Sequence, residues 1–280
     1  MLEANPKTPS LLPQKQRYYN YKLPPMKKIH LIFSTLFCLL TQSIGATALP
    51  FDFVYLKEVD PSIVQEMRYA TDHNFIGHPI TGYRAAECIL TLSAANALSA
   101  VQKTLKKSAL SLKVYECYRP QQAVDEFIAW SQRPEQQQMK AEFYPRVDKK
   151  DFFKLGYVAS KSGHTRGSTI DLTIVPLPVP PQKTYSKKQK LVSCFAPYLT
   201  RFPDNSIDMG TGFDCMDELS HNDNLNITPA AFKNRTLLKT EMERQGFSPY
   251  REEWWHFTLK NEPHPDSYFN FPVTKDPSKN

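Results

Sequence analysis

The segment from Ser162 to Val175 reads SGHTRGSTIDLTIV and contains the most clearly patterned strand of the chain. From Thr169 onward, polar and apolar residues alternate, as in a β-strand whose successive side chains point to opposite faces of a sheet. One face carries Ile170, Leu172 and Ile174, and the other carries Thr169, Asp171 and Thr173. The pattern predicts a sheet with an apolar face for the core and a polar face that presents the Asp171 carboxylate.

His164 lies just before this strand, in a turn between Gly163 and Gly167. Because glycine permits backbone angles that other residues avoid, the turn can fold back over the strand. The imidazole of His164 would then lie near Asp171, although seven positions separate the two residues. Imidazole and carboxylate groups are typical zinc ligands. The simpler alternative is that Asp171 only caps a turn.

A second polar cluster lies near the C-terminus, in Glu253-Trp254-Trp255-His256. His164, Asp171 and His256 would supply three ligands and leave a fourth zinc position for water, as catalytic zinc sites require. The unliganded Glu253 suits the general base of metal-assisted hydrolysis. Alternatively, His256 is a core histidine packed beside the tryptophans. The presence of both clusters in one chain favours the metal site.

Arg119 lies where a predicted strand meets a predicted helix, directly before Pro120, which suits a first helical turn. In a metal-dependent hydrolase, a fixed guanidinium near the metal can stabilise the oxyanion of the reaction. Without that context, Arg119 is more simply a surface residue paired with an acid. We therefore assign it to catalysis only together with the two clusters above.

The other predicted elements combine few strands with several helices, which favours an α+β fold. Helices are predicted at 60–70, 93–107, 120–130 and 228–245, strands at 110–118, 168–175 and 255–259, and an irregular proline-rich insertion at 176–206. Ser93 and Thr228 are the expected caps of the second and fourth helices. We predict one α+β domain over residues 49–280, with helices that flank a small, mainly antiparallel sheet carrying the zinc site.

Residues 26–48 have the pattern of a signal peptide. Met26-Lys27-Lys28 is a short cationic start, residues 31–40 are largely apolar, and Ala46-Thr47-Ala48 offers a cleavage site. Ten apolar residues are too few to cross a hydrocarbon core of ~30 Å, which takes about 20 residues in a helix. Cleavage is therefore favoured over an uncleaved anchor. We expect a periplasmic or secreted protein with no stable membrane span, and we interpret residues 1–25 as an upstream extension.

Much of the net charge of +7 comes from residues 1–48, the upstream extension and the signal peptide together. Residues 1–48 hold six of the 35 Lys and Arg residues and one of the 28 acids, which leaves 29 basic and 27 acidic residues elsewhere. A net charge of +2 over the remainder does not form the basic stripe of a nucleic-acid-binding protein. We expect no nucleic-acid partner.

Loss of the leader would leave four cysteines, at positions 88, 117, 194 and 215. An even number in an exported protein favours disulfides, and no two of them have the close spacing of zinc ligands. We predict the pairs Cys88–Cys117, which ties the strand before Arg119 to the chain before the second helix, and Cys194–Cys215, which tethers the insertion. Four unpaired buried thiols are the alternative.

Several motifs together resemble those of the zinc D-alanyl-D-alanine dipeptidases. They are residues 156–173 around the first histidine, Tyr118-Arg119-Pro120, residues 213–221, residues 253–256 and residues 263–269, in order along the chain from Phe53 to Val273. The resemblance implies a D-alanyl-D-alanine dipeptide substrate and one zinc per chain. It assigns that zinc to His164, Asp171 and His256, the base to Glu253 and transition-state stabilisation to Arg119. We also assign Ser162, Tyr118 and Asp214, which lie in these motifs, to substrate binding.

Three features depart from the family pattern. Glu116-Cys117 stands where Asp-Gly is frequent, Gly163 replaces a frequent serine, and the insertion is long. They concern the rim of the pocket more than the metal, so they affect substrate range first. The alternatives are a carboxypeptidase acting on longer wall peptides and a wall-binding module with an inactive site, although the intact Glu253 favours an enzyme. Because an exported enzyme does not meet the cytosolic precursor pool, we expect a role in cell-wall turnover and D-alanine salvage.

Overall fold

The computed structural model describes residue 22 and residues 49–276. The predicted signal peptide and, apart from Lys22, the predicted upstream extension lie outside the described residues. Within the described part, no helix is both long enough and apolar enough to cross a bilayer.

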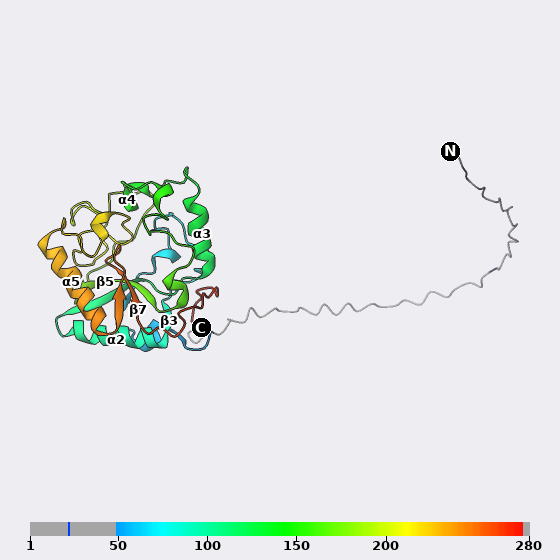
Figure 1. Ribbon diagram of the computed structural model, residues 1–280, viewed down its shortest axis with the longest axis horizontal. Helices are drawn as coiled ribbons and strands as arrows, with labels where there is room; N and C mark the ends of the chain where they lie inside the picture. The colour runs from blue at the N-terminus through cyan, green and yellow to red at the C-terminus, as the bar shows by residue number, and fades with distance from the viewer. Residues whose placement is uncertain (1–21, 23–48, 277–280) are drawn as a thin grey trace, which may run out of the picture. The chain divides into compact units, whose positions relative to one another are not determined.

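A five-stranded sheet forms the centre of the fold (Figure 1). Its strands lie in the order β2 (Val64–Gln65), β4 (Leu110–Glu116), β5 (Thr169–Pro176), β7 (His256–Leu259) and β6 (Phe247–Pro249). Only β2 and β4 are parallel, and the other neighbours are antiparallel. A separate antiparallel pair joins β1 (Phe53–Tyr55) to β3 (Ile89–Thr91). The prediction of a small, mainly antiparallel sheet is confirmed.

Helices surround this sheet. They are α1 (Leu56–Val59), α2 (Leu92–Lys106), α3 (Gln121–Ser131), α4 (Lys140–Phe143) and α5 (Pro229–Arg244), with 3₁₀ turns η1 (Arg68–Ala70), η2 (Lys149–Asp151), η3 (Gly163–Arg166) and η4 (Glu218–Ser220). Figure 1 shows α2 and α5 close to the strands, whereas α3 and α4 lie in another part of the domain. The helices predicted at 93–107, 120–130 and 228–245 correspond to α2, α3 and α5, which together with the sheet confirms the α+β class.

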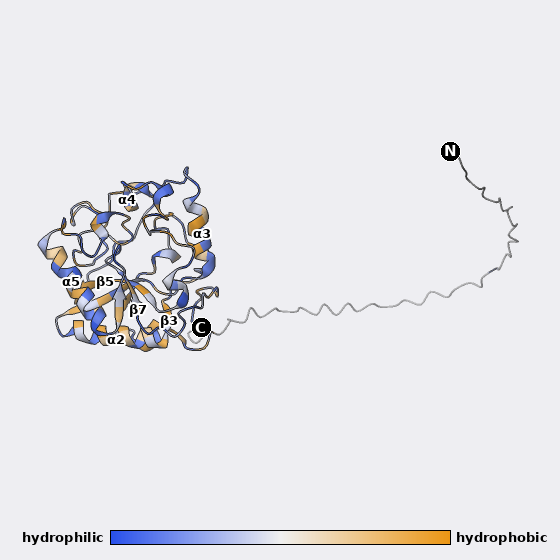
Figure 2. Ribbon diagram, viewed as in Figure 1, coloured by the Kyte–Doolittle hydropathy of each residue, from blue (hydrophilic) through white to orange (hydrophobic). Residues whose placement is uncertain are grey.

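One apolar core lies between the sheet and helices α2 and α5, and a second includes residues of α3 and α4. The inward residues of β5 are fully buried beside apolar residues of α2 and α5, among them Leu98, Leu105, Leu238 and Met242. Figure 2 shows the corresponding alternation of hydrophobic and hydrophilic residues along α2. Burial of each such side chain contributes about 1.5–3 kcal/mol. Helices α2 and α5 therefore cover the apolar face of the sheet, and Asp171 lies on the opposite, polar face.

Two local predictions were wrong. Residues 60–70 contain β2 and η1 instead of a helix, because Val64 and Gln65 pair with β4. The cap of α2 is Thr91, whose hydroxyl accepts a hydrogen bond from the Ala94 amide, and not Ser93. Helix α5 follows the prediction, since the Thr228 hydroxyl accepts from the Ala231 amide.

Both predicted disulfides are present. Cys88 is bonded to Cys117 and Cys194 to Cys215. The irregular insertion is also confirmed, because no helix or strand lies between Pro176 and Glu218.

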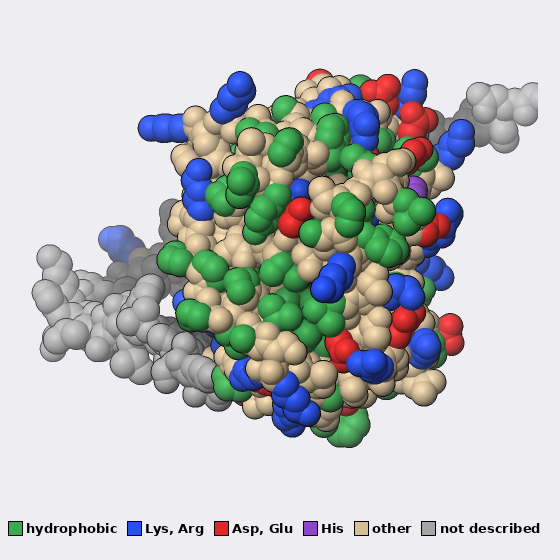
Figure 3. Space-filling view, turned by 90° about the vertical axis from the view of Figure 1, so that its left-hand side faces the viewer, with side chains coloured by type: hydrophobic (Ala, Val, Ile, Leu, Met, Phe, Trp, Pro, Cys, Tyr) green, Lys and Arg blue, Asp and Glu red, His purple; other side chains and the backbone are tan. Residues whose placement is uncertain are grey.

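On the face shown in Figure 3, Lys and Arg side chains are scattered around hydrophobic ones, and the described residues form no continuous basic stripe there.

Candidate metal centre

Three neighbouring strands place Glu116, Asp171 and His256 in one row across the sheet. Glu116 is paired with Asp171 on β5, and Asp171 is paired with His256 on β7. The register of β4 shifts between Val114 and Glu116. Without this bulge, Glu116 would share the helix-facing side with Val114, two residues earlier. The extra residue turns Glu116 to the polar face, as bulges next to functional sites often do.

A 3₁₀ turn brings His164 over this row. The turn begins after Ser162, whose hydroxyl accepts a hydrogen bond from the His164 amide, and ends at Gly167 with a φ of +85°. Only glycine fits there, because a Cβ at Gly167 would lie 2.3 Å from the ring of Phe53. The ring Nδ1 of His164 lies 2.8 Å from the carbonyl oxygen of Cys117. Since a carbonyl only accepts, Nδ1 carries the hydrogen and Nε2 offers its lone pair to the site.

The ligand atoms of His164, Asp171 and His256 converge as a metal requires. Nε2 of His164 lies 3.2 Å from Oδ1 of Asp171 and 3.3 Å from Nδ1 of His256, and the last two atoms are 3.1 Å apart. Tetrahedral ligands at 2.0–2.1 Å from zinc would be separated by about 3.3 Å. Oδ1 of Asp171 is buried and makes no well-aligned hydrogen bond. The three residues therefore fit a metal ion bound in tetrahedral geometry.

The electrostatics of the site agree with a cation-binding group. Burial alone would raise the pKa of Asp171, but the two imidazole rings outweigh it and hold this pKa far below its usual value. Burial also opposes a charge on His256, but the carboxylates of Asp171 and Glu253 raise its pKa to about 10. The acidic groups thus hold a positive charge where the ligand atoms meet.

Glu253 lies beside the metal ligands without joining them. Its Oε2 is 3.4 Å from Nδ1 of His256, and its side chain remains 16% exposed toward the cavity. It does not belong to the group of three convergent ligand residues. A carboxylate in this place is free to accept and return a proton.

Arg119 is held by Glu116 from the same strand end. Its Nε lies 2.7 Å from one carboxylate oxygen of Glu116 and its Nη2 lies 2.5 Å from the other, while Nη1 is 3.4 Å from the Ser162 hydroxyl. Burial would lower the pKa of Arg119, but Glu116 raises it well above its usual value. Tyr83 donates a further hydrogen bond to Glu116. Glu116 has no role among the residues predicted from the sequence, although an acid three residues before an arginine was an available signal.

A cavity of about 300 Å³ opens over these groups. Its lining includes Arg119, Ser162, Asp171, Asp214, Glu253 and His256. Asp214 has a φ of +57° and accepts a hydrogen bond of 2.9 Å from the Tyr69 hydroxyl. Burial raises the pKa of Asp214 well above its usual value, and the charges of Asp171 and Glu253 add to this effect.

Tyr118 lies apart from the other residues assigned to substrate binding. Its ring is buried and stacks on Phe271 at 4.1 Å, and its hydroxyl donates to the Phe271 carbonyl at 3.0 Å. It is not among the residues that line the cavity. These contacts describe a packing role, so we leave Tyr118 out of the substrate contacts proposed below.

Comparison with known proteins identifies relatives of this chain. Residues 50–177 and 198–274 match the model of a peptidase family described as D-ala-D-ala dipeptidase. D-alanyl-D-alanine dipeptidases of Streptomyces coelicolor and Enterococcus faecalis are each 38% identical over 222 residues, which cover 79% of this chain and 98% of each relative. The D-alanyl-D-alanine dipeptidase of Escherichia coli is 33% identical over 208 residues, 74% of this chain and 84% of the relative. Residues 178–197, within the insertion, lie outside the family match.

Proposed function

The chain belongs to the D-ala-D-ala dipeptidase family of metallopeptidases, and from this premise we propose that it hydrolyses D-alanyl-D-alanine to D-alanine with one zinc ion. The proposal assigns the zinc to His164, Asp171 and His256. The observation that carries it is the convergence of these three ligand atoms at 3.1–3.3 Å, with Glu253 adjacent but outside the set.

Bound zinc supplies Lewis acidity, which polarises a carbonyl and lowers the pKa of water. The residues of the chain supply the rest. Glu253 accepts the proton of the attacking water and passes it to the leaving amine. Arg119 presents Nη1 to the cavity, because Glu116 occupies Nε and Nη2, and this nitrogen stabilises the negative charge that develops on the substrate oxygen.

The cavity suits a small zwitterion. Its volume lies at the lower end of the ~300–1,000 Å³ typical of ligand sites. A free dipeptide carries an ammonium and a carboxylate close together. We assign the ammonium to the side of the cavity that holds Asp214 and Glu253, and we assign Ser162, whose hydroxyl faces Arg119, to the positioning of the peptide.

The test is hydrolysis of D-alanyl-D-alanine by the purified protein, with a chelator and with restored zinc. Release of D-alanine that stops on chelation and returns with zinc is the expected result. A wall pentapeptide ending in D-alanyl-D-alanine serves as the comparison substrate. Preference for the pentapeptide would replace the dipeptidase by a carboxypeptidase, and activity that a chelator leaves intact would remove the metal from the proposal.

We further propose that the enzyme acts outside the cytoplasm in the salvage of D-alanine from cell-wall turnover. The support is the leader, with its cationic start at Met26 and its small residues before Leu49. An exported dipeptidase would meet wall fragments and not the cytosolic precursors. Cell fractionation tests this, since active protein confined to the cytosol would contradict both the location and the role.

A further inference from the structure

One cysteine of each disulfide lies close in sequence to a residue of the candidate site. Cys117 lies two residues before Arg119, and Cys215 directly follows Asp214. The sulfur atoms themselves do not line the cavity. Their influence on the reaction must therefore pass through the backbone that they hold.

The Cys88–Cys117 disulfide holds the backbone that orients a metal ligand. Strand β4 ends at Glu116, so Cys117 lies beyond the hydrogen-bonded ladder of the sheet. Its carbonyl nevertheless fixes the His164 ring through the 2.8 Å contact to Nδ1. Cys88 and Cys117 are both buried, and the next amide, that of Tyr118, donates to the Ile89 carbonyl beside Cys88. Such contacts behind a metal ligand set its orientation and tautomer.

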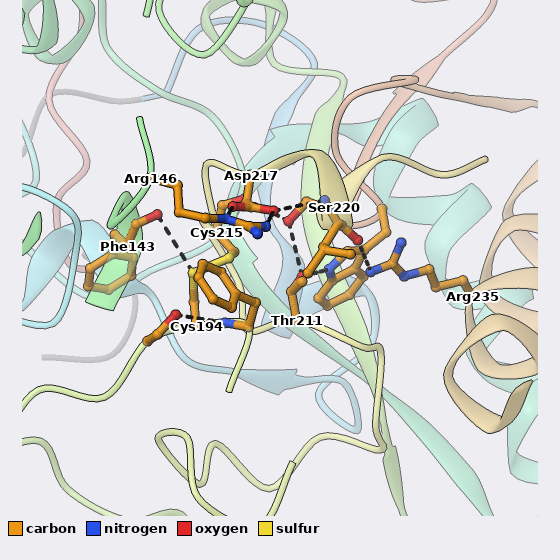
Figure 4. Close-up of a disulfide and its surroundings, with 12 residues drawn as sticks. Phe143, Arg146, Cys194, Thr211, Cys215, Asp217, Ser220 and Arg235 are labelled. Carbon is orange, nitrogen blue, oxygen red and sulfur yellow. Dashed lines mark hydrogen bonds and ion pairs between the residues drawn. A yellow bond between two sulfur atoms is a disulfide. The ribbon is translucent and has the colours of Figure 1, made fainter. Parts of the chain in front are cut away.

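The Cys194–Cys215 disulfide holds a second part of the cavity lining, and Figure 4 shows this disulfide with Phe143, Arg146 and Asp217 nearby. Asp214 and Met216, on either side of Cys215, both line the cavity in a segment without regular structure. The left-handed backbone of Asp214 is unfavourable for a residue with a side chain, so its surroundings must maintain it.

Other contacts also restrain this segment: the Tyr69 hydroxyl donates to Asp214 at 2.9 Å, the Ser220 hydroxyl donates to the Cys215 carbonyl at 2.6 Å, and the ring of Phe213 stacks on Tyr115 at 4.3 Å. The Met216 amide donates to the Phe143 carbonyl at 2.8 Å, and Asp217 is paired with Arg146, whose Nε lies 2.6 Å from its carboxylate. Cys194 belongs to residues 178–197, which lie outside the family match. The chain thus anchors a wall of its substrate cavity to a segment of its own.

We propose that the two disulfides are positioning elements with separate tasks. Cys88–Cys117 maintains the geometry of the metal ligand His164 and of Arg119, whereas Cys194–Cys215 maintains the substrate wall around Asp214. The inference rests on the proposed function for the identity of the metal and the substrate. Its consequence is that loss of the first disulfide weakens metal binding, and loss of the second weakens substrate binding without affecting the metal.

The experiment compares the double variants C88S/C117S and C194S/C215S with the oxidised wild type. Zinc affinity is measured by competition with a chromogenic chelator, and kcat and KM are measured with D-alanyl-D-alanine. For C88S/C117S we expect about 10–100-fold weaker zinc binding, the usual effect of losing a contact behind a ligand. For C194S/C215S we expect wild-type zinc affinity and a KM raised about tenfold or more, the size of effect that follows from misplaced substrate contacts.

Each variant is the control for the other, and circular dichroism and thermal unfolding report whether both are folded. Folded variants that keep wild-type zinc affinity and KM would overturn the inference, and so would equal losses in both, which indicate general destabilisation. Wild-type protein that binds zinc but does not hydrolyse the dipeptide would instead contradict the proposed function. The zinc affinities of the variants would still test the first disulfide in that case, because they are measured without substrate.

If a variant does not fold, graded reduction of the folded wild type replaces it. A water-soluble phosphine supplies two electrons per disulfide and becomes the phosphine oxide, and one water molecule supplies the oxygen of the oxide and the two protons of the two thiols. Mass spectrometry after thiol labelling identifies which disulfide has opened at each stage. Zinc loss should follow the opening of Cys88–Cys117, and a rise in KM should follow the opening of Cys194–Cys215. The reverse assignment, or no relation, would overturn the inference.

Discussion

Two buried groups of charged residues lie on the polar side of the same sheet, and they differ in which atoms meet at their centre. The metal cluster consists of His164, Asp171 and His256. The anchor cluster, under the insertion, contains Glu66, Arg68, Lys113, Asp204 and Asn205. In the anchor cluster, Nζ of Lys113 lies 2.7 Å from Glu66 and 2.9 Å from Asn205, and Nε of Arg68 lies 2.6 Å from Glu66 without a well-aligned hydrogen bond. In the metal cluster, Oδ1 of Asp171 faces only ring nitrogens without a well-aligned hydrogen bond.

This difference indicates a structural role for the anchor cluster and a functional role for the metal cluster. Burial of an ion is costly, and a partner of opposite charge offsets part of that cost. The anchor cluster contains its own partners, so it completes itself when the chain folds. The metal cluster brings two ring nitrogens and a carboxylate oxygen to within 3.1–3.3 Å of one another, as ligands of one metal ion would lie. Perturbed pKa values occur in both clusters, so the convergence of ligand atoms, and not the pKa values, distinguishes the candidate catalytic cluster.

Substitution of a metal ligand should have the largest effect on activity. His256→Ala leaves two protein ligands, which hold a catalytic zinc poorly. We expect loss of zinc together with a loss of activity larger than the ~10²–10⁴-fold typical of removing a general base. Zinc content per chain and D-alanine release are the measurements. His78→Ala, at an exposed position, is the control and should change neither.

Removal of Glu253 should separate the base from the ligands. Glu253→Ala leaves His164, Asp171 and His256 in place, so zinc content should stay near one per chain while activity falls about 10²–10⁴-fold. Glu252→Ala, the adjacent carboxylate that does not line the cavity, is the matched control. Near-normal activity of Glu253→Ala would remove it from the mechanism. Loss of zinc would make it a ligand and require a new assignment of the metal cluster.

The sequence predicted the metal cluster better than its surroundings. His164, Asp171 and His256 lie in local motifs, and strand alternation alone places Asp171 on the polar face. The orientation of Glu116 depends on a bulge, which the alternation of β4 does not reveal. The ligand atoms meet because the register of β5 and β7 pairs Asp171 with His256. The local sequence does not reveal this register, because the two residues are far apart in the chain.

The anchor cluster illustrates the same limit. Alternation along β4 correctly places Lys113 on the polar face, where a lysine is normally solvated. In the structure Lys113 is only 1% exposed, because Asp204 and Asn205 of the insertion cover it. A contact between residues about 90 positions apart leaves no local pattern. The helix wrongly predicted at 60–70 has the same origin, since the pairing of β2 with β4 overrides local preference.

Breaking the anchor cluster should affect stability and not catalysis. Lys113→Ala removes one of the two buried cations beside Glu66 and Asp204 and leaves Arg68 in place, so the loss should lie below the ~3–5 kcal/mol typical of removing one partner of a buried ion pair. Urea unfolding should show this loss, while kcat and KM of the folded protein remain near wild type. Lys188→Ala, at an exposed position of the insertion, is the control. Lower activity without a change in stability would mean that the two clusters are functionally coupled.

The smallest expected effect concerns Glu142, which lies near the anchor cluster and accepts a hydrogen bond from Nε2 of His73 at 2.7 Å. Nδ1 of His73 accepts from Arg68 at 2.8 Å, so the ring is neutral, and burial together with Arg68 lowers its pKa to about 2. Burial raises the pKa of Glu142 from 4.5 to about 7, although Arg68 opposes the shift. The folded protein therefore holds a proton on Glu142 in a pH range where the unfolded chain has released it.

The sign of the pH dependence follows from that proton. The contribution of Glu142 to stability is complete below pH 4.5 and is lost as the pH rises through about 7. Its size is about 3 kcal/mol. Glu142→Gln keeps an acceptor for His73 but does not titrate, and the opposite pH dependence of His73 is common to both proteins. The free energy of unfolding of the wild type, relative to Glu142→Gln, should thus fall as the pH rises between these limits. Urea unfolding of both proteins across this range measures the difference, and parallel stability curves would contradict the prediction, because they would show that folding does not change the protonation of Glu142 in this range.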